Sequence, residues 1–227
     1  ITASRFFRNP EALSPGKRER VENAARQLGY VPDLAARALA SRRTEVIGVL
    51  IPSFTNNVFS DVLRGIYDGS GESRYSIQLV NTHYSILQEE KLLRLFKAQR
   101  PAGLVVTGIN QTNESRAILE SMNCPIVQIM ELGPDPVDMM VGFSHNAAAF
   151  EVISHLIGLN FKRIGFLGAR MDPRVQRRLE GYTDAMKRAS LYDPRLIIAT
   201  PVPTSVTMGG TLFADLLMKA PDIDAVF

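Results

Sequence analysis

Short apolar runs alternate with amphipathic segments from Val46 to the last residue. Each run is apolar at successive positions, as expected for a strand that is buried on both faces inside a parallel sheet. The runs are VIGVLIP, SIQLVN, AGLVVTG, PIVQIME, DMMVGF, RIGFLGA, RLIIAT and IDAVF. Helices are predicted between most of them, at residues 58–70, 87–99, 113–122, 146–158, 173–189 and 207–220. This alternation predicts an α/β fold with doubly wound parallel sheets.

Residues 1–29 have a different pattern, which predicts short helices. ITASRFFRNP must leave the helical conformation at Asn9, because a residue that precedes proline is disfavoured there. Ser14-Pro15 combines a capping residue with a proline at the first helical position, and Gly29 is a typical helix terminator. An apolar stripe lies between them, formed by Val21, Ala24, Ala25 and Leu28. We therefore expect a small helical module before the α/β part.

The segment between these two parts raises a question of stability. Pro32 suits a first helical position, and residues 33–41 are rich in strong helix formers. The run lasts barely two turns, whereas isolated helices shorter than about 12 to 15 residues are marginal in water. Something outside this segment must therefore order it.

The net charge of +3 is unevenly distributed. Residues 1–45 hold nine Lys and Arg against five Asp and Glu, a net charge of +4, whereas the remaining residues hold 17 against 18. A basic segment of this kind suits a phosphate backbone, although a solvated helix face would have the same composition.

The composition also bears on the cellular compartment. No apolar run approaches the roughly 18 residues of a membrane span, and the first residues lack the layout of a secretory signal. The single cysteine, Cys124, excludes an intramolecular disulfide, and its apolar surroundings favour a buried, inert thiol. We expect a cytoplasmic protein with no membrane partner.

Ligands of open α/β sheets bind outside the carboxyl ends of the strands. The residues that follow the predicted strands are strongly polar, and Phe59 and Phe143 add apolar faces. This set suits a sugar-like ligand, because polyols need many donors and acceptors together with an aromatic face. The alternative is that loops at strand ends are simply polar. The polar residues are Asn56, His83, Thr107, Glu131, Ser144, His145, Arg170, Asp172, Arg174 and Arg178.

No pattern of catalytic or metal-binding residues is evident. His83 and His145 are not part of a metal-ligand spacing, and no nucleophile is paired with a base in the sequence. Hydrogen bonding to a ligand and a structural role both remain open for these two histidines. GFLGAR lacks the glycine spacing of a dinucleotide site. We expect no catalytic residues, no metal and no cofactor, and therefore not an enzyme.

The stretch TASRFFRNPEALSPGKRERVENAARQLGYVPDLAARALASRRTEVIGVLIPSFTNNVFSDVLRGI resembles the start of a lac repressor family regulator. The likeness continues through RPAGLVVTG, RIGFLGARMD and RRLEGYTDAM. Within the family, SRFFRNPE, TNNVFSDVLRGI and VGFSHNAAA are similar to the gluconate-operon repressors. The family fold comprises a helix-turn-helix module, a hinge helix and an effector domain of two subdomains of periplasmic-binding-protein type.

This resemblance implies a division of the chain into domains. Residues 1–30 would be a partial helix-turn-helix domain, 31–45 the hinge helix and linker, 46–143 the effector-binding N-subdomain, and 144–227 a truncated C-subdomain. We expect the start of the recognition helix and the last strands of the family to lie outside these residues. The implied partners are double-stranded operator DNA, a small sugar-acid effector and a second copy of the chain in a homodimer, with a tetramer as an alternative.

The resemblance also implies DNA contacts. Thr2, Ser4 and Arg5 match the recognition helix, where hydroxyls can donate to phosphate and Arg5 can contact either a guanine edge or a phosphate. Asn9 ends that helix as a cap or a DNA contact. Leu39 matches the hinge leucine that wedges into a central base step, with Ala38 and Arg42 beside it, although Leu39 could instead dock on the effector domain.

The effector positions of the family fall on residues at the strand ends. Arg178 matches an arginine that contacts the effector in much of the family, and its guanidinium fork suits a carboxylate. Glu131 is counter-evidence, because it would repel an acid unless it faces the hydroxyl end of the ligand. The expected effector residues are Asn56, Phe59, His83, Thr107, Glu131, Phe143, Arg170, Asp172, Arg174 and Arg178.

The hypothesis is a sequence-specific repressor whose operator binding is controlled by a sugar acid of the gluconate or ketogluconate type. A free-standing sugar-binding protein of similar fold is the first alternative. An α/β enzyme acting on sugars is the second, and it would need a catalytic pair that the sequence does not display.

Overall fold

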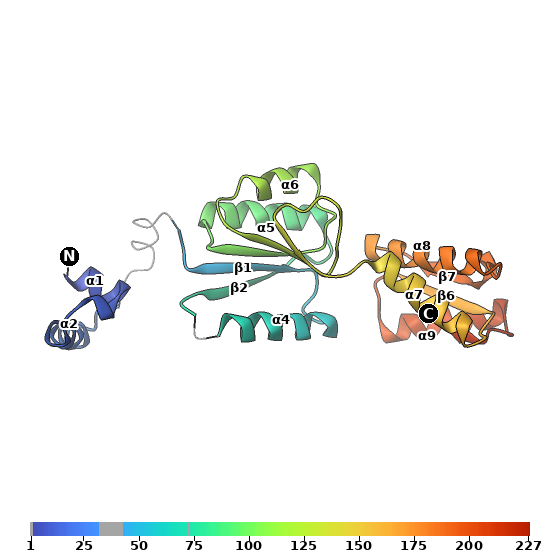
Figure 1. Cartoon of the computed structure of the whole chain (residues 1–227), viewed down its shortest axis with the longest axis horizontal. Helices are drawn as coiled ribbons and strands as arrows, with labels where there is room; N and C mark the ends of the chain where they lie inside the picture. The colour runs from blue at the N-terminus through green and yellow to red at the C-terminus, as the bar shows by residue number, and fades with distance from the viewer. Residues whose placement is uncertain (1, 32–42, 72) are drawn as a thin grey trace. The chain divides into compact units, whose positions relative to one another are not determined.

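The computed structural model of the protein describes residues 2–31, 43–71 and 73–227 (Figure 1). The chain divides into two compact units. Unit 1 is Ile1–Leu104 with Ser121–Pro125, and unit 2 is Val105–Glu120 with Ile126–Phe227. Residues 32–42 of the predicted hinge helix and linker (31–45) lie outside the described residues, and the predicted domain bounds remain a prediction.

The beginning of unit 1 is helical, as the sequence predicts. Helix α1 spans Thr2–Arg8, a short 3-10 helix spans Pro10–Ala12, and α2 spans Pro15–Gln27. Leu28 is the C-cap of α2, and the next residue, Gly29, has a φ of 58° and allows the amide of Tyr30 to donate to the carbonyl of Ala25 at 2.9 Å. This left-handed terminator is the one expected from the glycine.

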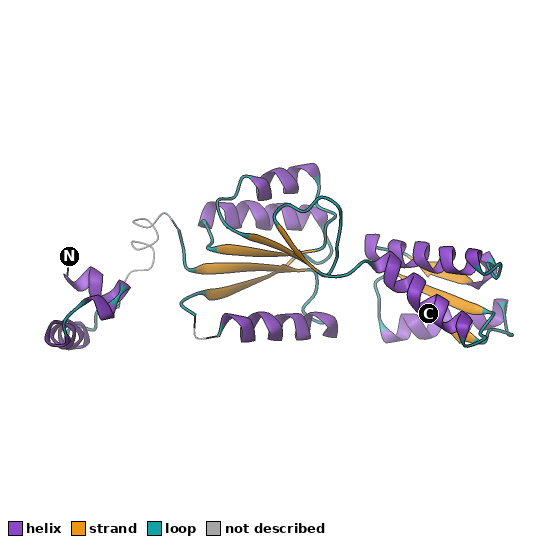
Figure 2. Cartoon of the chain, in the orientation of Figure 1, coloured by secondary structure: helices purple, strands orange, loops and turns teal. Residues whose placement is uncertain are grey.

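A parallel α/β arrangement follows, with helices drawn in purple and strands in orange in Figure 2. One sheet has the strand order β2-β1-β3-β4-β5, and the pairs β1/β2 and β4/β5 are parallel. In unit 1, α4 (Asn57–Ser70) and α5 (Ile86–Gln99) lie on opposite faces of β1 and β2 (Figure 1). The strands are β1 Val46–Ile51, β2 Ser76–Asn81, β3 Gly103–Thr107, β4 Ile126–Ile129 and β5 Met139–Val141.

Unit 2 contains a second parallel sheet, of order β7-β6-β8. Its core joins α7 and α8 to β6 through the buried side chains of Ile153, Phe166, Tyr182 and Met186. The helices approach closely at Gly181, where an added Cβ would stand 2.1 Å from the carbonyl oxygen of Asn146. The elements are α6 Asn113–Glu120, α7 His145–Gly158, β6 Ile164–Ala169, α8 Pro173–Arg188, η2 Pro194–Leu196, β7 Ile197–Thr200, α9 Val206–Lys219 and β8 Ala225–Val226.

The predicted α/β class is confirmed, and the differences are at element ends. The run DMMVGF forms only the short strand β5, and RLIIAT begins as the 3-10 helix η2 because Asp193 and Pro194 start a helical turn. Within the described part of the chain, no helix is long and apolar enough to cross a membrane.

Candidate ligand-binding site

Left-handed backbone conformations occur directly after several strands. Residues other than glycine adopt a positive φ at some energetic cost, and such strain is concentrated at functional sites. The carboxyl ends of the strands are also where parallel sheets bind ligands. The residues are His83 and Tyr84 after β2, Met130 after β4, and Arg170 and Met171 after β6, and Gly108 after β3 adds a φ of 83°.

In unit 1, the amide side chain of Asn56 is used locally. Its Oδ1 accepts from the amide of Val58 at 3.1 Å and so caps α4, and its Nδ2 lies 3.5 Å from the hydroxyl of Tyr84. His83 is exposed, and its backbone amide donates to Asn81 Oδ1. Phe59 is only 2% exposed, so its ring lies within the protein core and presents little surface to a ligand. Tyr84 is a candidate that the sequence analysis missed.

Glu131 is the most buried acidic group at the strand ends of unit 2. It is 1% exposed, and its Oε1 forms a short ion pair with Nη1 of Arg177. The other oxygen, Oε2, is also buried and has no hydrogen-bond partner among the described residues. Burial raises the pKa of Glu131, and the guanidinium groups of Arg177 and Arg174 oppose this shift. A buried acceptor without a donor is costly, so Oε2 is a ready position for a ligand hydroxyl.

Arg177 connects two loops of the same unit. Its Nη2 donates to Oδ1 of Asn110 at 2.6 Å, while its Nη1 contacts Glu131. Asn110 lies after β3, and Glu131 lies after β4. The guanidinium fork thus joins the carboxyl ends of two strands through an arginine in the second turn of α8.

His145 is the first residue of α7 and is 1% exposed. Its Nδ1 accepts a hydrogen bond of 3.2 Å from Nε of Arg178. Burial, followed by the charges of Arg178 and Arg174, lowers the pKa of His145 to about 4. The imidazole is therefore neutral at pH 7. Phe143 packs edge-on against it, with 4.6 Å between ring centroids.

Arg178 has a guanidinium that can receive an anion. Burial lowers its pKa, and the neighbouring Arg174 lowers it further. The hydrogen bond to His145 uses Nε and leaves both Nη groups without a partner among the described residues. These two groups have the planar fork geometry that binds a carboxylate with two hydrogen bonds.

The first turn of α8 adds one more charge pair. Oδ1 of Asp172 caps the helix by accepting from the amides of Arg174 and Val175. Its Oδ2 lies 3.5 Å from Nη2 of Arg174. We call the residues that interact electrostatically here the basic cluster. With neutral His145, it has three arginines against two carboxylates, a net charge of +1, and consists of Glu131, His145, Asp172, Arg174, Arg177 and Arg178.

The structure thus brings several sequence-predicted residues of unit 2 together. Glu131, Asp172, Arg174 and Arg178 belong to the basic cluster, and Phe143 contacts its histidine. Thr107 is the last residue of β3, and the amide of Arg170 donates to the carbonyl of Val202 at 2.8 Å.

Arg177 and Asn110 were not among the residues predicted from the sequence. A signal existed for Arg177, because positions 174, 177 and 178 are spaced three and four residues apart and share one face of a helix. Asn110 carries no comparable signal, since its contact with Arg177 spans 67 positions of the chain.

The DNA-contact residues are only partly described. Arg5 is exposed on α1, and its carbonyl accepts from the amide of Asn9 at 2.8 Å, which places Asn9 at the end of the helix. Thr2 and Ser4 lie in α1, although their side chains are not described. Ala38, Leu39 and Arg42 lie outside the described residues.

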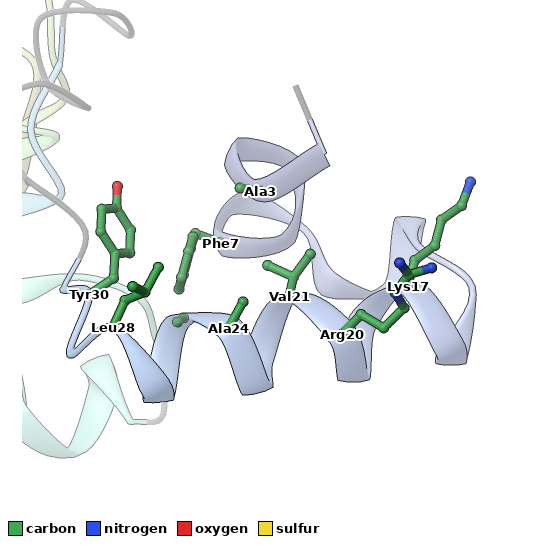
Figure 3. Close-up of a pocket in the computed structure, with 9 residues that line it drawn as sticks. Ala3, Phe7, Lys17, Arg20, Val21, Ala24, Leu28 and Tyr30 are labelled. Carbon is green, nitrogen blue, oxygen red and sulfur yellow. The ribbon is translucent and has the colours of Figure 1, made fainter.

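The apolar stripe of α2 faces α1, as Figure 3 shows. Phe7 points from α1 toward Ala24 and Leu28, and its ring centroid lies 5.5 Å from that of Tyr30. Together these side chains line a groove of about 500 Å³ with a largely apolar surface. The predicted stripe therefore forms one wall of this small helical module.

The matching family model is described as "Periplasmic binding proteins and sugar binding domain of LacI family" and covers residues 44–227. The chain belongs to this family. The HTH-type transcriptional regulator GntR of Pseudomonas aeruginosa is 38% identical over 227 residues, which cover 100% of this chain and 66% of the relative. GntR of Escherichia coli K12 is 32% identical over the same length, with 68% of the relative covered. The chain thus spans about two thirds of the length of these relatives.

A solved structure agrees with this assignment. A LacI family transcriptional regulator from Silicibacter pomeroyi is similar with a TM-score of 0.87 and 34% sequence identity, over 99% of this chain and 68% of that one. The expected lac repressor family is therefore confirmed, and these relatives are named as transcriptional regulators. The matches to both GntR proteins cover the whole of this chain, including the helical module before residue 44. This coverage favours a regulator over a free-standing sugar-binding protein.

Proposed function

We propose that the protein is an operator-binding repressor whose affinity for DNA is controlled by a sugar acid of the gluconate or ketogluconate type. The observation that carries this proposal is the basic cluster of unit 2. It combines a guanidinium fork on Arg178 with a buried carboxylate oxygen on Glu131 that lacks a donor. A fork suits a carboxylate, and an open acceptor suits a hydroxyl, so the two together fit a polyhydroxy acid.

Each unit carries further predicted effector contacts, which are proposed for that unit alone. Asn56 and His83 are the polar candidates of unit 1, and Thr107 and Arg170 are those of unit 2. Phe143 is 46% exposed and can cover a C–H face of the ligand. Phe59 then has a packing role, since its ring is buried.

DNA binding is assigned to the first 45 residues, which carry a net charge of +4. Arg5 is exposed on α1 and is available to a base edge or a phosphate. Leu39 lies outside the described residues, and in this proposal it contacts the minor groove of operator DNA as part of a homodimer. Two-fold symmetry of the protein then requires a pseudo-palindromic site.

Control of DNA binding follows from linkage. An effector that binds one arrangement of the effector domain more tightly shifts the population toward it. If that arrangement also favours or disfavours the ordered hinge, the acid changes operator affinity by the same coupling free energy.

Calorimetric titration of the full-length protein tests the effector class. Gluconate, 2-ketogluconate and 5-ketogluconate are titrated beside neutral glucose, and we expect at least one acid to bind. Arg178→Ala should weaken that acid by about 10-fold to 100-fold, the range for a lost charge-assisted hydrogen bond. Arg188→Ala, which removes an exposed arginine at the other end of α8, is the control and should bind normally. Absence of binding by all three acids would refute the sugar-acid proposal.

A further inference from the structure

A buried glutamate in an acid-binding site needs an explanation. Glu131 would repel the carboxylate of a sugar acid if its charge were uncompensated. We propose that Arg177 sets the acid specificity of this site by neutralising Glu131, so that the site accepts a polyhydroxy acid and not only a neutral polyol. This inference rests on the sugar-acid function proposed above.

The contacts of Arg177 support this role. Its Nη1 pairs with Oε1 of Glu131, and its Nη2 donates to Asn110 at 2.6 Å. The pair is partly buried, since the side chain of Glu131 is 1% exposed and that of Arg177 is 31% exposed. Ion pairs of this kind are screened little by salt. Arg177 is therefore held in place by Glu131 and Asn110, and we expect it to stay paired with Glu131 when a ligand binds.

The pairing leaves Glu131 with one function toward a ligand. Oε1 is occupied by the guanidinium, whereas Oε2 is buried and has no donor among the described residues. An added Cβ at Gly108 would lie only 4.0 Å from Oε2, so backbone without a side chain borders this oxygen. Oε2 can then accept a hydroxyl hydrogen bond, while Arg177 cancels the charge that would repel the acid.

The charges of the basic cluster give the expected consequence. Replacing Arg177 by methionine keeps an unbranched apolar stem but removes one positive charge, which lowers the net charge of the cluster from +1 to 0. It also removes the ion-pair partner of the Glu131 carboxylate, so that above its pKa this carboxylate repels the acid. A neutral polyol has no charge to be repelled, and it still finds an acceptor at Oε2.

The experiment compares a single and a double variant of the full-length protein by calorimetry. The ligands are the sugar acid that the wild type binds and glucitol, the neutral polyol, measured by competition where its affinity is low. Arg177→Met should weaken the acid by about 100-fold and glucitol by less than about 5-fold. Arg177→Met combined with Glu131→Gln should recover at least 10-fold of the lost acid affinity, because the amide carries no charge to repel the carboxylate.

Arg116→Met is the matched control. Arg116 pairs with Glu120 and Asp135 in the same unit, and it has no part in the basic cluster. Its loss should leave the affinity for the acid unchanged.

The outcomes separate the two proposals. A wild type that binds an acid, together with an Arg177→Met variant that loses acid and glucitol equally, would show that Arg177 only supports the structure. Failure of Glu131→Gln to recover acid affinity in the double variant would also overturn the inference. A wild type that binds none of the acids would refute the sugar-acid function itself, and the inference with it.

Discussion

The burial of His145 leads to a specific prediction about the stability of the fold in acid. It is 1% exposed at the start of α7, and burial together with Arg178 and Arg174 lowers its pKa to about 4. In the unfolded chain a histidine titrates near 6.5. Between these two pH values the unfolded state binds a proton that the folded state does not, so stability falls as pH decreases. The contribution is fully present above about pH 6.5 and is lost progressively down to about pH 4.

The size of the effect follows from the shift. A difference of about 2.5 pKa units corresponds to roughly 3 kcal/mol, since one unit is about 1.4 kcal/mol. Glu131 contributes with the opposite sign, because burial raises its pKa. The total pH profile therefore mixes several groups, and only the difference between wild type and a variant isolates the histidine.

His145→Gln is the informative variant. The glutamine amide cannot be protonated in this range, and its oxygen can still accept from Nε of Arg178. We expect the wild type to lose about 2 to 3 kcal/mol relative to the variant between pH 7.5 and pH 4.5. The measurement is urea unfolding at several pH values, with hydrogen exchange of the α7 and α8 amides to follow unit 2. His155→Gln, at an exposed position of the same helix, should leave the profile unchanged.

Equal pH profiles for wild type and His145→Gln would refute this reasoning. Such a result would mean that His145 has the same pKa in the folded protein as in the unfolded chain. The hydrogen bond from Arg178 would then not hold the imidazole in its neutral form.

Further predictions concern burial and packing. Burial raises the pKa of Glu89 to about 7, so its carboxylate destabilises the fold as pH rises from about 4.5 to 7. Glu89→Gln should therefore stabilise the protein by roughly 2 kcal/mol at pH 8 and have little effect at pH 4. Urea unfolding midpoints at the two pH values measure this difference. Gly181→Ala should destabilise unit 2 by about 3 kcal/mol, since the Cβ would lie 2.1 Å from the carbonyl of Asn146. Gly209→Ala is its control, because nothing lies within 4 Å of that Cβ and a helical alanine should stabilise by about 1 kcal/mol in the same unfolding assay.

The fold was accessible from the sequence because its elements have strong local signals. The run VIGVLIP is apolar on both faces and forms β1, in which Val49, Leu50 and Ile51 are buried. Gly29 ends α2 with the left-handed conformation that glycine favours. Such features depend on neighbours within a few residues, so they can be predicted without knowledge of tertiary contacts.

The site was accessible only in outline. Glu131 and Arg178 could be placed at strand ends, but the pairing of Glu131 with Arg177 joins residues 46 positions apart. The sequence alone suggests that Glu131 would repel an acid, whereas in the structure one of its oxygens is paired with Arg177 and the other has no donor among the described residues. Likewise, Phe59 is an aromatic residue that was predicted to contact a ligand, but its ring is buried. Which side of a helix or loop a side chain faces is decided by tertiary packing, and no local pattern records it.

Operator affinity of the full-length protein, with and without the sugar acid, tests the account most directly. Fluorescence anisotropy on a specific operator duplex should show a change in the dissociation constant of at least about 10-fold on saturation with the acid, within the usual range of allosteric coupling. Arg178→Ala should abolish this response at the same acid concentration while binding the operator as tightly as the unliganded wild type. An operator affinity that is the same with and without every acid that binds, or an absence of specific binding to any duplex, would contradict the account.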